Sequence, residues 1–352
     1  MLKNKLSSVF NLFLDLTVNT IFPIIKKQLK GELEKDFRSF GVEDTNVCNA
    51  RCSFCAYRLD YDKRPKGFVD EKVLKHSLEL FKKLGSNNIF SFISILGDPL
   101  TDKDILKKMR LITSDPSIKG ASIYTNLIGL DEYDIDEFVQ SGVTVLNVST
   151  CLGGKEMYKR LFGVDEYDRV MNNIVNLLEA NKRHGNPIKT TLLIRMDYPV
   201  EKHLDSQVLN KINSFIGKDK LDILPNNMWD DYNDKIKIGD LPRGGVFKNN
   251  YADKRIPCYA LYRKMQILLN GDIAVCSCRV SPDLVTDNIF NYQNLNDYWH
   301  GDKLKIFRQN WIDGKVPGIC KGCNHYLPVT GLEKKILKRR IKDRIRKIMF
   351  RR

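Results

Sequence analysis

The sequence predicts an α/β protein in which parallel strands alternate with helices. Strand-like and helical segments follow one another in a repeated order through most of the chain, which is the pattern of βα units. The chain has 352 residues, of which 42% are hydrophobic and 29% charged, so it is long enough for one large domain and one small domain. A separate group of cysteines near the C-terminus indicates where the small domain lies.

The predicted helices carry apolar residues at helical spacing, and the segments between them are short and apolar like buried strands. The helices are expected at residues 70–84, 104–112, 131–141 and 167–181. Gly85 follows the first helix and is typical of a helix end. The strands are expected at residues 89–95, 121–125, 143–148, 190–194 and 221–224, with a sixth before Cys48.

Charge is unevenly distributed along the chain. The formal net charge is +15, but residues 333–352 hold eleven basic and two acidic side chains, so the rest of the chain is only mildly basic. Such a tail attracts nucleic acid or anionic lipid. An RNA-binding segment would carry base-stacking aromatics, and the tail has only Phe350. We therefore do not expect nucleic acid as a partner, and an RNA-modifying enzyme is the weaker alternative.

Two terminal segments are predicted to be amphipathic. Residues 9–25 are apolar-rich but interrupted by polar residues and Pro23, whereas a membrane span needs about 20 largely apolar residues. A helix in the basic tail would carry one apolar stripe, which is typical of a helix lying on a membrane surface. We expect the tail to bind the inner face of the membrane; packing on the body is the alternative for both segments. The apolar residues of the tail are Leu332, Ile336, Leu337, Ile341, Ile345, Ile348 and Met349.

The nine cysteines fall into two groups and one isolated residue. We see no signal peptide with a cleavage site, and the grouping favours metal binding in a reducing cytoplasm. Cys48, Cys52 and Cys55 form a C-x3-C-x2-C triplet with an aromatic residue before the last cysteine. Iron–sulfur clusters normally take four cysteines, so a triplet leaves one iron open to another ligand. Zinc is the alternative, but zinc sites usually add a second C-x2-C or a His pair.

The triplet resembles the motif of the radical S-adenosylmethionine (SAM) enzymes, and the resemblance covers about residues 40–326. It implies a partial (β/α)6 barrel of the TIM type, with the chemistry on loops after the strands. It also implies a [4Fe–4S] cluster that binds SAM and cleaves it reductively to a 5′-deoxyadenosyl radical. The expected domains are an N-terminal amphipathic segment (1–39), the barrel (40–235), a cluster domain (236–330) and the basic tail (331–352).

The resemblance also implies where SAM binds. Gly97, Asp98 and Pro99 follow the second strand and resemble the family's G-G-E-P motif. Two positions depart from that motif, since Leu96 replaces a glycine and Asp98 replaces a glutamate. Arg195 follows a later strand, and its guanidinium suits the SAM carboxylate, while a strand-capping Arg is the alternative. The other expected SAM-binding residues are Phe54, Thr125, Asn126, Ser149 and Arg160.

The C-terminal cysteines resemble the shortened SPASM, or twitch, module, which holds one auxiliary [4Fe–4S] cluster. The shared spacing leads through Gly271, and residues 270–272 are predicted to form the turn between strands 265–269 and 273–275. Cys278 is a fifth cysteine able to replace one ligand, and zinc is the alternative metal. The expected auxiliary ligands are Cys258, Cys276, Cys320 and Cys323.

The resemblance implies hydrogen abstraction from a small molecule, with an electron donor such as flavodoxin or ferredoxin. One auxiliary cluster favours dehydrogenation, as in a relative that oxidises an aminocyclitol alcohol, so we expect a carbohydrate-like or lipid-linked substrate. Epimerisation is the second outcome, with Cys151 as candidate catalytic hydrogen donor, although a small buried hydrophobe is the simpler role for it. Peptide modification is the third, but only about 40 residues precede the triplet, and such enzymes often carry a separate peptide-recognition domain there.

Overall fold

The computed structural model describes residues 39–84, 89–216, 221–248, 254, 256–330, 337 and 341. The amphipathic segments expected at 1–39 and 331–352 lie almost entirely outside these residues, as does Gly85. No helix of the described ranges is long and apolar enough to cross a membrane.

The larger sheet has five strands that are all parallel and lie in chain order, β2-β3-β4-β5-β6. This order is expected when each strand is followed by a helix that returns the chain to the same end of the sheet. The α/β class is confirmed. The strands are β2 (Ile89–Ser91), β3 (Gly120–Thr125), β4 (Val143–Thr150), β5 (Lys189–Ile194) and β6 (Leu221–Pro225).

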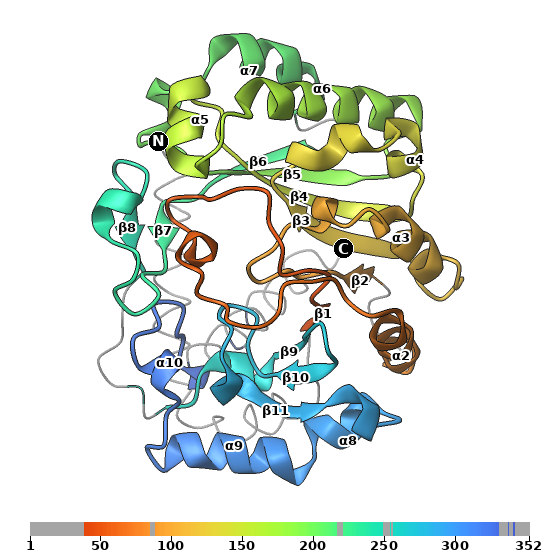
Figure 1. Ribbon diagram of the computed structural model, residues 1–352, viewed down its shortest axis with the longest axis vertical. Coiled ribbons are helices and arrows are strands. Elements are labelled where there is room, and N and C mark those ends of the chain that lie inside the picture. The colour runs from red at the N-terminus through yellow and green to blue at the C-terminus, as the bar shows by residue number, and fades with distance from the viewer. Residues whose placement is uncertain are drawn as a thin grey trace.

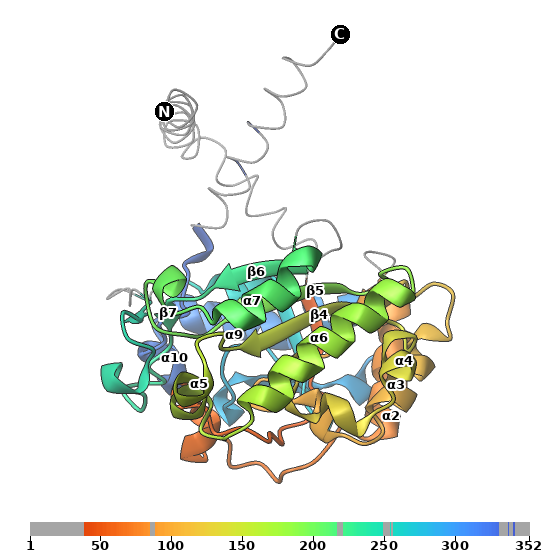
Figure 2. The ribbon, with the colours of Figure 1, turned by 90° about the horizontal axis from the view of Figure 1, so that it is seen from above.

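Helices cover one face of this sheet, and α6 and α7 lie across β4, β5 and β6 (Figure 2). The strand residues Ile123, Leu146 and Leu192 are fully buried in the core. At alternating positions, Tyr124 and Leu224 are 45% and 53% exposed, so the opposite face of the sheet is partly open. The helices are α2 (Glu71–Lys82), α3 (Ile105–Thr113), α4 (Ile135–Val139), α5 (Lys155–Phe162), α6 (Tyr167–Arg183) and α7 (Ser206–Ile212).

The helix expected at 131–141 is wrong as a single element. The structure forms a 3₁₀ turn at Ile128–Glu132 and then the short helix α4. The side chain of Asp134 accepts a hydrogen bond from the N–H of Glu137 at 2.8 Å, and it therefore caps a new helix in the middle of the expected one. The other expected helices are present within a few residues of their expected ends, and α5 and α7 were not expected.

The strand expected before Cys48 joins both parts of the molecule. β1 (Ser39–Val42) pairs in parallel with β9 (Lys264–Ile267) of a second sheet, β1-β9-β10-β11. Its backbone pairing with the larger sheet is one bridge, beside which the N–H of Ile93 donates to the carbonyl of Val42 at 2.8 Å. The expected strand at 89–95 ends at Ser91. The N–H of Phe92 still donates to Ser122 of β3, whereas that of Ile93 donates to Val42 of β1.

The C-terminal module packs around this second sheet (Figure 1). The expected hairpin is confirmed, since β9 and β10 pair antiparallel. Gly271 has φ +86° in the turn between them, a conformation that favours glycine. The other elements are β7 (Met228–Trp229), β8 (Val246–Phe247), β10 (Asp272–Ala274), β11 (Val285–Asn288), α8 (Leu295–Trp299), α9 (Asp302–Ile312) and α10 (Gly318–Lys321).

Candidate active site

The loop that carries the cysteine triplet follows β1 and is held by the end of α5. The N–H of Arg51 donates to the carbonyl of Phe162 at 3.0 Å, and that of Ser53 to the carbonyl of Leu161 at 2.8 Å. Gly163 ends α5 at φ +70°, and a Cβ atom there would lie 2.4 Å from the carbonyl oxygen of Arg51. Glycine therefore allows both the left-handed end of α5 and its close approach to the loop.

The thiols of Cys48, Cys52 and Cys55 lie close enough to affect one another. Burial raises the pKa of Cys48 to about 12, and the Asp98 carboxylate adds to the rise. Burial, followed by the charges of Cys55 and Cys48, raises the pKa of Cys52 well above its usual range. Bound metal replaces such protons, and three soft thiolates in one loop suit iron–sulfur chemistry. Among the described residues no three His, Cys, Asp or Glu side chains converge on a single metal ion, whereas cluster cysteines bind separate irons.

The Gly97-Asp98-Pro99 segment contacts the triplet loop through its backbone. A Cβ atom at Gly97 would lie 2.3 Å from the carbonyl oxygen of Thr45, so the two loops touch. The Asp98 carboxylate is buried and accepts hydrogen bonds from the N–H of Leu100 (3.0 Å), the hydroxyl of Thr125 (2.9 Å) and the N–H of Asn126 (2.6 Å). This carboxylate, one methylene shorter than the glutamate of the family motif, ties together two strand-end loops.

Asn126 connects this segment to the triplet. Its side-chain amide donates to Oδ1 of Asn49 at 2.7 Å and to Sγ of Cys48 at 3.9 Å. Its own Oδ1 accepts from the N–H of Ile128 at 2.9 Å, which fixes the amide orientation. The structure therefore brings Gly97, Asp98, Thr125 and Asn126 together beside Cys48.

An aromatic and cationic stack lies on the other side of the triplet. The rings of Phe54 and Trp229 are 4.5 Å apart, and the guanidinium of Arg195 lies 5.2 Å from the Trp229 ring centre. Nε of Arg195 donates to the hydroxyl of Ser149 at 3.3 Å. The Cys52 thiol acts electrostatically on Arg195, so this cation faces the triplet. Trp229 was not predicted from the sequence, because no motif marks it after β6.

Two expected site residues are engaged elsewhere in the protein. Nη2 of Arg160 donates to Asp197 at 2.7 Å, so this guanidinium is part of an ion pair. Cys151, just after β4, is fully buried in the hydrophobic core, and its Sγ accepts from the N–H of Gly153 at 3.4 Å. Burial raises the pKa of Cys151 to about 12. The roles expected for these two residues stay predictions.

One pocket in the C-terminal module brings together every cysteine of that region. The space has an empty volume of about 430 Å³, including its opening to solvent. Apart from His325, the rest of its wall is made mainly of apolar and aromatic side chains, among them Trp311 and Tyr326. The donor set is soft and suits an iron–sulfur cluster. The thiols that line the pocket are those of Cys258, Cys276, Cys278, Cys320 and Cys323.

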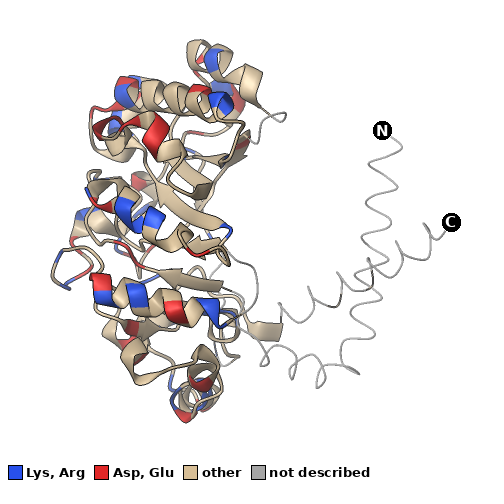
Figure 3. Ribbon diagram, turned by 90° about the vertical axis from the view of Figure 1, so that its right-hand side faces the viewer, with Lys and Arg blue, Asp and Glu red and all other residues tan. Residues whose placement is uncertain are grey.

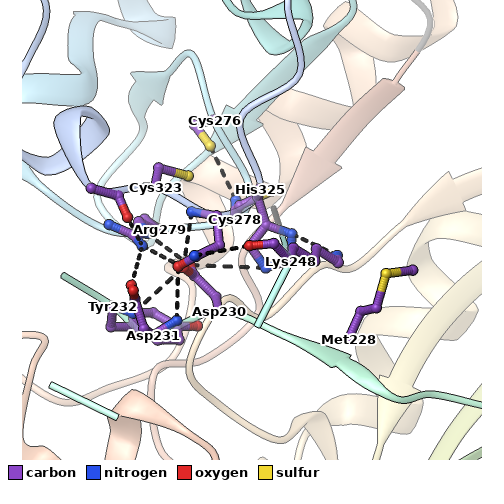
Figure 4. A network of polar contacts seen from close by, with 12 residues as sticks. Met228, Asp230, Asp231, Tyr232, Lys248, Cys276, Cys278, Arg279, Cys323 and His325 are labelled. Atoms are coloured by element: carbon purple, nitrogen blue, oxygen red, sulfur yellow. Dashed lines mark hydrogen bonds and ion pairs between the residues drawn. The ribbon is translucent and has the colours of Figure 1, made fainter. Parts of the chain in front are cut away.

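Charged side chains surround this pocket, and Figure 4 shows the network they form. Arg279 and Asp230 make an ion pair in which both side chains are almost fully buried. Nζ of Lys248 contacts Nδ1 of His325 at 2.9 Å, and Nζ of Lys264 contacts Sγ of Cys278 at 3.7 Å. Apart from Cys278, none of these residues was predicted from the sequence, because they come from separate segments and match no motif.

These two cysteine sites on an α/β sheet define an iron–sulfur enzyme, and comparison with known families identifies its class. Residues 42–197 match the Radical SAM superfamily, so the chain is a radical SAM enzyme. Residues 258–324 match the SPASM iron-sulfur cluster-binding domain, so it belongs to the members that carry a C-terminal SPASM module. Both resemblances read from the sequence are confirmed. The cofactors are therefore SAM, a [4Fe–4S] cluster that binds it, and auxiliary iron–sulfur clusters in the SPASM module.

Similar curated proteins match only part of the chain. A GTP 3′,8-cyclase of Actinobacillus pleuropneumoniae is 28% identical over 125 residues, which is 35% of each protein. The molybdenum cofactor biosynthesis protein moc-5 of Caenorhabditis elegans is 30% identical over 107 residues, or 30% of this chain and 17% of that protein. The chain thus spans about a third or less of the length of these relatives.

Solved structures share the fold over most of the chain. BtrN in complex with AdoMet and 2-DOIA has a TM-score of 0.52 and 19% identity, covering 83% of this chain and 94% of BtrN. Streptococcus suis SuiB bound to the precursor peptide SuiA has a TM-score of 0.56 and 16% identity, covering 87% and 76%. Native anSMEcpe with bound AdoMet has a TM-score of 0.51 and 14% identity, covering 88% and 98%. At these identities the likeness is one of fold.

Proposed function

We propose that this radical SAM enzyme oxidises a carbohydrate-like small molecule by removing two hydrogens. When bound at the triplet, SAM would supply a 5′-deoxyadenosyl radical able to take one hydrogen atom from a substrate carbon. Oxidation of the substrate would be completed by loss of one proton to solvent and one electron, and an oxidised auxiliary cluster held by the C-terminal cysteines would supply the acceptor for that electron. The observation that carries the proposal is the pocket lined by five cysteines and bordered by cationic side chains, which suits one electron-accepting cluster.

The triplet side of the site is proposed to bind and orient SAM. Cys48, Cys52 and Cys55 hold the cluster, and the backbone at Gly97 offers close approach. Arg195 has a hydroxyl partner and an aromatic neighbour but makes no ion pair within the described ranges, which leaves it suited to a carboxylate. Trp229, whose buried indole N–H has no hydrogen-bond partner among the described residues, extends the aromatic surface of Phe54. These contacts would exclude water from the reacting carbon.

The experiment that tests this function is anaerobic reconstitution followed by incubation with SAM, a reductant and pools of sugars and cyclitols. We expect about eight irons per chain, because two cubanes hold four each. 5′-Deoxyadenosine and a product two hydrogens lighter should form together. The control replaces the whole cysteine triplet with Ala, which should remove about four irons and all SAM cleavage. 5′-Deoxyadenosine formation in that control, or a redox-neutral product, contradicts the proposal.

The same assay separates oxidation from epimerisation through Cys151. A radical epimerase needs a hydrogen donor, so Cys151→Ala would still make 5′-deoxyadenosine but fail to complete the new stereocentre. The fully buried position of Cys151 favours the other outcome, in which turnover is largely retained. Modification of a peptide or an RNA is the alternative function, and no contact among the described residues favours either substrate.

Two partners complete the proposal. A flavodoxin or ferredoxin is proposed to deliver the electron that starts SAM cleavage. The basic C-terminal segment, residues 331–352, is proposed to attach the enzyme to an anionic membrane surface, which would suit a lipid-linked substrate. This proposal rests on the sequence pattern of that segment alone.

A further inference from the structure

Three lysines approach the auxiliary pocket from different segments of the chain. Lys264, in β9, places Nζ 3.1 Å from the hydroxyl of Ser277 and 3.7 Å from Sγ of Cys278. Lys248, just after β8, places Nζ 2.9 Å from Nδ1 of His325, which lines the pocket. Lys254 is 8% exposed, and its Nζ donates to the carbonyl oxygens of the loop between Cys320 and Cys323 at 2.6 to 3.1 Å. The three cations therefore contact residues or backbone of the segments that line the thiol-lined space.

The positive charge here exceeds the negative charge. Arg279 is balanced by Asp230 and lies 3.6 Å from Asp231, whereas Lys248, Lys254 and Lys264 make no ion pair with a carboxylate in the part of the chain that the structure describes. Buried charges in proteins are normally paired or bound to metal centres. The arrangement is therefore complete only when an anionic group lies between the thiols.

A thiolate-ligated iron–sulfur cluster is such an anionic group, and its charge becomes more negative by one when it is reduced. A fixed positive charge nearby stabilises the reduced form more than the oxidised form, so it raises the reduction potential. Each lysine thus favours electron arrival at the auxiliary site.

We propose that Lys248 and Lys264 tune the auxiliary cluster as an electron acceptor by raising its reduction potential, with Lys254 holding the loop that carries two of its ligands. This inference rests on the proposed function only in that an auxiliary cluster occupies the pocket. It explains why three separate segments each contribute a lysine to one apolar-walled space. A raised reduction potential would also favour transfer of the electron from the substrate to the auxiliary cluster.

The test measures the reduction potential of the auxiliary cluster by EPR-monitored redox titration. The full-length protein with the cysteine triplet replaced by Ala is used, so that only the auxiliary cluster titrates. Lys248→Met and Lys264→Met should each move the potential to more negative values. We expect roughly a tenfold change in the ratio of oxidised to reduced cluster at a fixed potential, which is about 59 mV for one electron. Lys248→Arg keeps the charge and should keep the wild-type potential.

A matched control removes a lysine of the same module that does not face the pocket. Lys305 on α9 is 62% exposed and lies near Asp302, so Lys305→Met changes the net charge of the protein by the same amount. We expect no shift in that variant. Unchanged potentials in both pocket variants at full iron content would overturn the inference, as would an equal shift in the Lys305 control. If one of the two variants, Lys248→Met or Lys264→Met, loses its iron, the reduction potential measured for the other variant tests the inference.

The iron content distinguishes failure of the proposed auxiliary cluster from failure of the proposed tuning by lysines. If the triplet-to-Ala protein holds no iron, the auxiliary cluster is absent and the proposed electron acceptor fails. If it holds about four irons but the lysine variants do not shift the potential, only the tuning role fails.

Discussion

At the scale of single residues, Asp44 shows how burial controls a charge beside the active site. Its side chain is fully buried, Lys108 lies 3.2 Å from one carboxylate oxygen, and the other oxygen has no hydrogen-bond partner among the described residues. Burial raises the pKa of Asp44 from 3.8 to about 7. Because the folded state then holds this proton more tightly than the unfolded chain, stability should fall as pH rises from about 4 to about 7.

We predict that Asp44→Asn weakens this pH dependence, because the amide cannot ionise. One unit of pKa shift corresponds to about 1.4 kcal/mol, so the difference should be visible in urea unfolding at pH 5 and pH 8. The wild type should lose more stability than the variant over that range, and Asp98, whose pKa burial raises to about 6, leaves part of the dependence in place. Asp115→Asn is the control, since the pKa of the partly exposed Asp115 is lowered to about 2, chiefly by its hydrogen bond from Lys82. Parallel pH profiles for wild type and Asp44→Asn would contradict the prediction.

The triplet shows which site residues the sequence could reveal. Cys48, Cys52 and Cys55 lie within eight residues, so their spacing in the sequence is enough to predict an iron–sulfur site. Lys248 and Trp229 act where they do because β7 and β8 bring them beside the two cysteine sites, and single residues in short strands leave no periodic pattern. Asp98 was found by its motif, but its contacts depend on a strand 27 residues later in the chain.

At the scale of elements, α5 positions the triplet. Two backbone hydrogen bonds join its last residues to the loop, and Gly163 makes that contact possible. The same scale shows the limit of sequence periodicity: the apolar pattern of 131–141 is helical, but the local hydrogen bond of Asp134 divides it. Caps of this kind depend on side-chain geometry that a hydrophobic pattern does not record.

Gly163→Ala should therefore disrupt the triplet more than the fold. The new Cβ would lie 2.4 Å from the carbonyl oxygen of Arg51, and α5 would have to move away from the loop. We expect lower iron content at the triplet and slower SAM cleavage, with the auxiliary iron retained. Gly185→Ala is a close control, because Gly185 has a similar φ of +78° but a Cβ atom there would meet no other atom within 4 Å. Both variants should lose stability by about 1 kcal/mol from backbone strain. Equal iron loss in the two would show that strain, and not the contact, is responsible.

At the scale of the whole molecule, charge separates the body from the tail. Basic and acidic residues are interspersed along the helices seen in Figure 3. Much of the net charge of +15 comes from residues 333–352. A protein with this distribution presents its cationic character at one end, where anionic lipid would attract it.

Truncation after Thr330 should abolish binding to anionic liposomes. Each Lys or Arg near such a surface contributes about 1 kcal/mol, and the total falls steeply with salt. The full chain should sediment with anionic vesicles at low salt and remain in the supernatant with neutral ones. The truncated chain should remain in the supernatant with both. Equal, negligible sedimentation of the two proteins with anionic vesicles would exclude the membrane proposal.

The pairing of β1 with β9 also affects when the two cysteine sites can form during folding. Ser39 lies opposite Lys264 in the ladder. The strand that leads into the triplet can therefore pair only after β9, more than 200 residues later in the chain, has been synthesised. Contacts this distant in sequence form late, because a long loop must close first. The first cysteines to leave the ribosome are thus among the last to be fixed in place. We therefore expect both cysteine sites to become ordered at a late stage of folding, and iron delivery to follow synthesis of the chain.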